Sequence, residues 1–171
     1  MPELTLQERL QPSLLDRLTD DDPHSRQESR GDRVISMRQL RDSVLRDLGW
    51  LMNTSNLTSV HDLASFPEVA ESVLNYGVPD LTGLTVSSVD VVELQRAIRK
   101  AVIRFEPRLL PHTVRVQVAA SDEHMSHNAL TFLIEAQLWA QPLPLQVFLK
   151  TEIDLELGSV KVVEQTAQET F

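Results

Sequence analysis

The first half of the chain carries apolar side chains at three- and four-residue spacing, the period of a helix that buries one face. The clearest run follows Ser36, whose hydroxyl can cap a first turn. Its apolar positions are Met37, Leu40, Val44, Leu48 and Leu51. Charged side chains occupy the other faces of this run. We therefore predict an amphipathic helix that begins directly after Ser36.

Two further helices are predicted downstream. The shorter one begins at Pro67, since proline is favoured in a first turn, and it ends before Gly77. The longer one begins after a cap at Ser87 or Ser88. It ends by Glu106, because the proline that follows disfavours helical geometry in the residue before it.

From residue 113 to residue 164 the pattern changes to strict alternation, which indicates half-buried strands. The alternating apolar positions are Val114, Val116, Val118, Leu130, Phe132, Ile134, Ala136 and Leu138. A polar loop at 121–128 separates these two runs, so they predict an antiparallel hairpin. Two more strands, 146–155 and 159–164, meet at a turn containing Gly158. The predicted class is α+β, with N-terminal helices packed on one face of a C-terminal antiparallel sheet.

The chain divides into three parts by composition. Residues 1–35 are polar and predict a flexible N-terminal segment, with one short helix whose apolar side chains must dock on its own domain or on another chain. Those side chains are Leu14, Leu15 and Leu18. Residues 36–165 form a single α+β domain, and 166–171 form a tail.

Charge and composition reduce the number of functional classes to which the protein could belong. The 171 residues are 24% charged and 42% hydrophobic, with a formal net charge of -9. Such an acidic chain has no overall attraction to nucleic acid or to an anionic membrane surface. The absence of cysteine excludes disulfides and thiolate metal sites, and it favours a reducing compartment. With no signal peptide and no apolar run of about 20 residues, we expect a cytoplasmic protein without membrane insertion.

Two groups of side chains are candidate chemical sites. Glu152 and Asp154 share one strand face and could form a glycosidase pair, but Lys150 shares that face, which is typical of an exposed charged surface. His124 and His127 lie in the polar loop with two carboxylates, at a spacing that matches no known metal site. We therefore expect neither an enzyme nor a bound metal or cofactor.

The corner after the third helix is the most informative local feature. Glu106 places a carboxylate at the unfavourable end of the helix dipole, Pro107 fixes the exit, and Arg108 presents a planar fork of donors. An internal salt bridge and a rigid knob that engages another chain both explain these residues.

Several segments, in order along nearly the whole chain, resemble the TssE family of lysozyme-like baseplate wedge subunits from bacterial type VI secretion systems. This family is related to a baseplate wedge protein of contractile-tailed phages. The segments are Leu14–Leu18, Leu48–Thr54, Ser72–Gly83, Phe105–Leu109, Gln141-Pro142 and Thr151–Asp154. Asn75-Tyr76-Gly77 with Pro79-Asp80, and the Glu106-Pro107-Arg108 corner, carry most of the specificity.

The resemblance implies a structural role at a cytoplasmic baseplate associated with the inner membrane. The implied partners are TssF, TssG and TssK in the wedge and the TssB/TssC contractile sheath, with Glu106, Pro107 and Arg108 docking on the wedge core.

Beside this, we expect the last strand, through Val160 and Val162, to accept a sheath strand at its open edge. The leucines at 14, 15 and 18 are further candidates for partner binding. The alternative is a peptidoglycan hydrolase that uses Glu106, Glu152 or Asp154 as acid and base.

Overall fold

The computed structural model describes residues 13–19, 36–119, 128–140 and 144–165. Several interpretations from the sequence lie outside these ranges: most of the N-terminal segment, residues 121–127 of the polar loop with His124 and His127, the break at Gln141-Pro142, and the tail.

The described chain contains four α-helices, α1 (Leu14–Leu18), α2 (Met37–Met52), α3 (Pro67–Ala70) and α4 (Val91–Phe105). Helix α2 begins as predicted. The Ser36 hydroxyl accepts the Gln39 amide at 3.2 Å, and the Gln39 side chain accepts the Ser36 amide at 2.9 Å. This reciprocal capping satisfies two amides of the first turn. None of these helices is long and apolar enough to span a bilayer.

The other two helix predictions need correction. The helix that begins at Pro67 ends at Ala70 and is followed by a 3-10 turn at Val73–Asn75. There Nδ2 of Asn75 donates to the Ala70 carbonyl at 2.9 Å, so a side chain satisfies the helix end. Helix α4 is capped by Asp90, not by Ser87 or Ser88. The Asp90 carboxylate accepts two amides of the first turn, whereas Ser88 belongs to a separate 3-10 turn at Val86–Ser88.

The sheet has four strands in the order β1-β2-β3-β4, each antiparallel to its neighbour. They are β1 (Arg115–Val118), β2 (Ala129–Leu138), β3 (Leu145–Asp154) and β4 (Ser159–Glu164). The predicted hairpin and the last strand are confirmed, and β3 begins one residue earlier than the pattern suggested. Both β1 and β4 are therefore edge strands.

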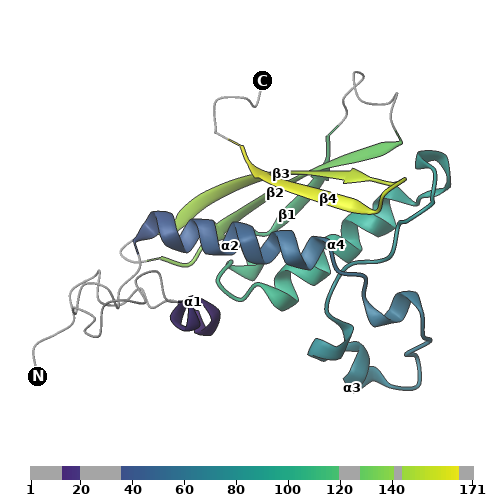
Figure 1. Cartoon of the computed structure of the whole chain (residues 1–171), viewed down its shortest axis with the longest axis horizontal. Coiled ribbons are helices and arrows are strands. Elements are labelled where there is room, and N and C mark those ends of the chain that lie inside the picture. The colour runs from purple at the N-terminus through teal and green to yellow at the C-terminus, as the bar shows by residue number, and fades with distance from the viewer. Residues whose placement is uncertain (1–12, 20–35, 120–127, 141–143, 166–171) are drawn as a thin grey trace, which may run out of the picture.

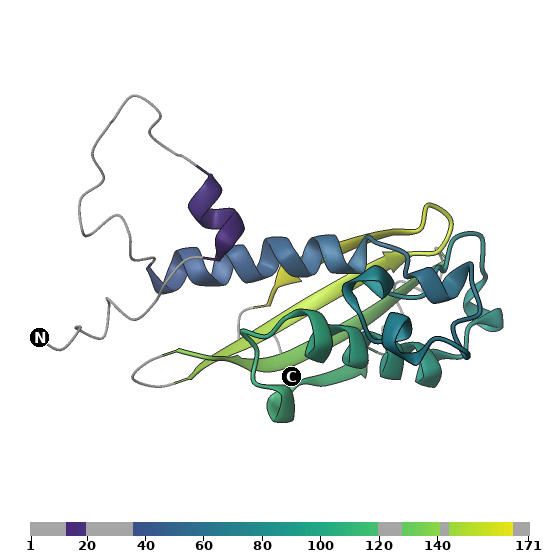
Figure 2. The same ribbon diagram turned by 90° about the horizontal axis from the view of Figure 1, so that it is seen from below.

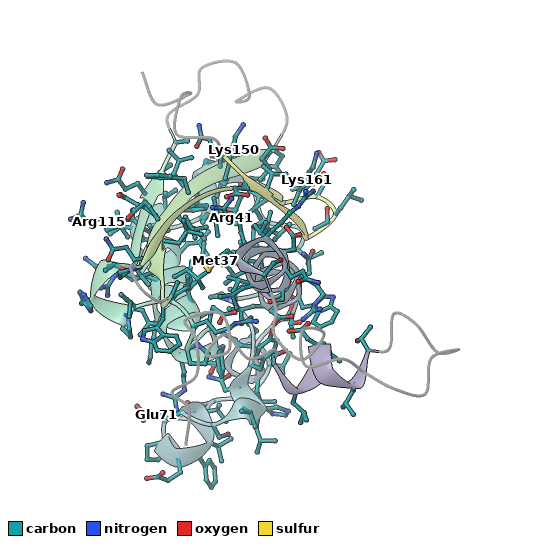
Figure 3. The ribbon with its side chains drawn as sticks, turned by 90° about the vertical axis from the view of Figure 1, so that its left-hand side faces the viewer. Met37, Arg41, Glu71, Arg115, Lys150 and Lys161 are labelled. Atoms are coloured by element: carbon teal, nitrogen blue, oxygen red, sulfur yellow. The ribbon has the colours of Figure 1, made fainter. Side chains whose placement is uncertain are left out.

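Helices α2 and α4 cover the same face of this sheet, α2 under β4 and α4 under β1 (Figures 1 and 2). The sheet curves over α2 when viewed along that helix (Figure 3). The largest fully buried side chains fill the space between the two layers. They include Phe132, Ile134, Leu138, Leu149, Leu48 and Ile98. The α+β class with helices on one sheet face is confirmed.

Gly77 brings the loop after α3 against the end of α2. Its φ is +123°, and a Cβ there would clash with the Thr54 carbonyl oxygen. This close approach lets Val78 and Thr54 pair through their backbones at 2.9 Å. Glycine is required here both by the dihedral angle and by the space.

Candidate functional site

Glu106 lies at the end of α4 and is only 2% exposed. The Arg108 guanidinium closes on it as a fork, with Nε 2.7 Å from Oε1 and Nη2 2.5 Å from Oε2. The Arg108 amide donates to the same carboxylate at 3.2 Å. Pro107 stands between them on the exposed side of the corner. A carboxylate at the negative end of a helix is thus stabilised by a bidentate cation.

The same guanidinium reaches across to α2. Nη2 lies 2.6 Å from Oδ2 of Asp47, and Nη1 lies 3.1 Å from the Ser43 hydroxyl. Burial opposes the charged form of Arg108, but the Glu106 and Asp47 carboxylates outweigh it and raise the Arg108 pKa. Four of the five N–H groups of the Arg108 side chain are therefore used inside the molecule.

This geometry is the internal salt bridge that the sequence offered as one explanation of the corner. It also includes Asp47 and Ser43 of α2. Docking of the corner on another protein stays a prediction. Sequence reasoning missed Ser43 and Asp47. The signal was their spacing of four residues, which places both polar side chains on one helix face beside the apolar stripe.

Tyr76, in the loop after α3, packs next to the Glu106-Pro107-Arg108 corner. The Tyr76 ring packs edge-to-face against Phe105, with centroids 5.1 Å apart. Burial, together with the negative charges of Asp47 and Glu106, raises the Tyr76 pKa. The two most specific motifs in the sequence, around Tyr76 and around Arg108, are thus brought together by the fold.

The open edge of β4 is partly covered by Asn53, the residue that ends α2. The Val160 amide donates to Oδ1 of Asn53 at 2.9 Å, and Nδ2 of Asn53 donates to the Val160 carbonyl at 2.7 Å. The Asn53 side chain therefore pairs with Val160 as a neighbouring strand would. Backbone groups of successive strand residues alternate in direction, so Val162 and Glu164 also point their backbone groups away from β3.

The side chains of Val160 and Val162 pack against the core, so any contact of this edge with a partner would be made by backbone atoms. Among the described residues, nothing bonds the outward backbone groups of Val162. Arg41 of α2 holds the Glu164 carboxylate at 3.2 Å; Figure 3 shows Arg41 between α2 and the sheet.

Helix α1 is tied to α2 by charge and not by its leucines. Asp16 lies 2.7 Å from Nη1 of Arg46. Burial opposes ionisation of Asp16, but the Ser13 hydrogen bonds and Arg46 outweigh it and lower the Asp16 pKa. Leu14 and Leu18 are each 74% exposed, and Leu15 is 42% exposed. The described part of the chain does not cover these leucines, and their docking on another chain stays a prediction.

The strand carboxylates lie on the charged face of β3. Lys150 pairs with Glu152 at 2.9 Å, and Lys150 projects from the sheet face opposite α2 (Figure 3). Asp154 accepts the Glu156 and Leu157 amides in the turn before β4. Within the described ranges, no group of three or more histidine and carboxylate side chains could hold a metal ion.

Two helices, α2 and α4, on one face of a four-stranded antiparallel sheet, with an accessible edge at β4 and an internally braced corner at Arg108, define the α+β domain of this chain. The family model of the baseplate wedge protein gp25 matches residues 38–143, and the chain belongs to this family. No curated protein and no solved structure gives a significant match. The matched region contains the whole Arg108 network and ends just before β3.

Proposed function

We propose that this protein is the TssE-type wedge component of a type VI secretion baseplate, a structural subunit without catalytic activity. It would dock on the TssF/TssG wedge core, with TssK, and provide the platform from which the TssB/TssC sheath assembles. Its place would be in the cytoplasm, at the baseplate next to the inner membrane. Membership of the baseplate wedge family supports this role.

The proposed role in sheath assembly rests on the open edge of β4. Asn53 covers this edge at Val160 and leaves it open at Val162. The Val162 backbone faces away from β3, and no described residue pairs with it. An incoming strand could extend the ladder there. Each hydrogen bond adds about 0.5–1.5 kcal/mol, so a short ladder binds weakly by itself. A ring of wedges would supply the affinity through multivalency.

Two proline variants test this edge. Val162→Pro removes a donor that points outward, so the fold should keep its ladder to β3 while sheath nucleation is lost. Val163→Pro is the matched control, because the Val163 amide points toward β3 and its loss should lower the melting temperature. Normal sheath assembly on a folded Val162→Pro protein would refute strand addition at β4.

The wedge contact is assigned to the Glu106-Pro107-Arg108 corner. Pro107 is exposed, and Arg108 retains one unused N–H group on a side chain that is 22% exposed. A pull-down of TssF and TssG with Arg108→Lys, compared with the wild-type protein, tests this contact. We expect weaker capture, since lysine keeps the charge and loses the planar fork.

The hydrolase alternative receives no supporting observation. Both oxygens of Glu106 are held by Arg108, Glu152 pairs with Lys150, and Asp154 accepts two turn amides. A glycosidase needs two carboxyl groups that face one substrate, whereas Glu106 lies buried at the end of α4, Glu152 lies along β3 and Asp154 lies at the turn before β4. We expect no clearing of purified cell walls in a turbidity assay; clearing that Glu152→Gln abolishes would overturn the non-catalytic role.

A further inference from the structure

The solvent-facing side of α4 carries a basic groove that the proposed function does not use. Its volume is about 320 Å3. It is lined by Arg96, Arg99, Lys100, Ile103 and Arg104. All four cationic residues are exposed, whereas Ile103 is half-buried and forms an apolar patch among them. These residues differ from those of the β4 edge and of the Arg108 corner.

The fold does little to neutralise this groove. The side chains of Arg96 and Lys100 make no hydrogen bond or ion pair with another described residue. Arg104 forms a long ion pair with the Glu71 carboxylate, at 3.7 Å. The Nε–H of Arg99 donates a hydrogen bond to the Val114 carbonyl at 3.0 Å. Like charges four residues apart on a helix destabilise it. This concentration of cations stands out in a chain whose net charge is -9.

We propose that this groove binds an acidic amphipathic segment of another protein. Arg96, Lys100 and Arg104 follow one another at four-residue spacing, so they span about 12 Å along the helix. A partner helix with carboxylates at i, i+4 and i+8 matches that span, and an apolar side chain between them would cover Ile103. Charge complementarity of this kind gives specificity and accelerates association.

Charge also argues for a protein segment over the two other polyanions. Nucleic acid and anionic membranes present negative charge over a surface much wider than one helix, and such a surface would also meet the rest of an acidic chain. A short acidic segment contacts only the groove.

The test is a titration of the full chain, followed by amide NMR shifts, with a synthetic helical peptide that has glutamates at i, i+4 and i+8 and leucine between them. We expect shifts centred on 96–104, and affinity that falls as salt rises from about 0.05 to about 0.3 M. Arg96→Glu with Lys100→Glu should weaken binding at least ~10-fold, because both contacts become repulsive. Arg38→Glu, a charge reversal at an exposed position of α2, should not weaken it.

Absence of shifts at about 1 mM peptide overturns the proposal. Equal binding by the double variant, with an unchanged melting temperature, also overturns it. Tighter binding of duplex DNA or of anionic vesicles through the same residues would assign the groove to that polyanion instead. Self-association in sedimentation that the double variant abolishes would assign it to a second copy. Each result is independent of whether the protein joins a secretion baseplate.

Discussion

Replacing Arg108 with alanine should destabilise the isolated protein by about 2–4 kcal/mol, because it removes the cation from a largely buried network. Glu106 is 2% exposed, and the Asp47 side chain is 25% exposed. Breaking a buried ion pair costs about 3–5 kcal/mol, since one charge is left without its partner. The partial exposure of Asp47 and Arg108 reduces that cost. If Arg108 acted only in binding a partner, Arg108→Ala would leave the stability of the isolated protein unchanged.

Thermal and urea unfolding of the isolated protein measure this loss. At about 2–4 °C per kcal/mol for a chain of this size, the melting temperature should fall by roughly 4–16 °C. Arg104→Ala is the matched control, because its pair with Glu71 is long and exposed and is worth about 0–1 kcal/mol. A double-mutant cycle with Asp47→Ala should show coupling of about 0.5–3 kcal/mol. If Arg108→Ala melts within about 2 °C of the wild type, the network does not stabilise the fold and the reasoning is refuted.

Three further predictions follow from other contacts. Asn53→Ala should expose the Val160 backbone and increase self-association at the β4 edge; a strictly monomeric variant in sedimentation would contradict this. Gly77→Ala should destabilise the protein by more than ~1 kcal/mol in urea unfolding, because the methyl group meets the Thr54 carbonyl at a positive φ; equal stability would refute the steric argument. The lowered Asp16 pKa means that its contribution is present above the ordinary aspartate pKa and is lost as the pH falls through the folded-state value. The protection of the α1 amides, measured as exchange relative to the intrinsic rate at each pH, should therefore fall below about pH 4, and constant protection down to pH 3 would contradict the ion pair.

The elements that the sequence predicted well are those set by local periodicity. The stripe from Leu40 to Leu51 placed α2, and alternation from Leu130 to Leu138 placed the buried face of β2. The start of α4 was wrong because serines at 87 and 88 compete with Asp90 as caps within four residues. The choice depends on which side chain reaches two free amides at once, and residue type alone does not decide that.

The contacts that shape the candidate sites were not predictable in the same way. Arg108 meets Asp47 across 61 residues of chain, and Asn53 meets Val160 across 107. Each depends on how α2 lies against the end of α4 or the edge of β4, which local patterns do not specify. The sequence indicated that Arg108 would form strong hydrogen bonds, and the packing of the helices decided with which groups.

Internal bracing and docking at the Arg108 corner are compatible. A side chain that binds a partner ordinarily loses rotamer freedom, at a cost of about 0.5–1.5 kcal/mol. Glu106, Asp47 and Ser43 already fix the Arg108 guanidinium in the free protein, so its remaining N–H group and the exposed Pro107 are presented in one geometry. The same network joins the end of α4 to α2, and Asn53 joins the end of α2 to the β4 edge. The proposed wedge contact and the proposed sheath contact are therefore both anchored on a single helix, and displacement of α2 would disturb both.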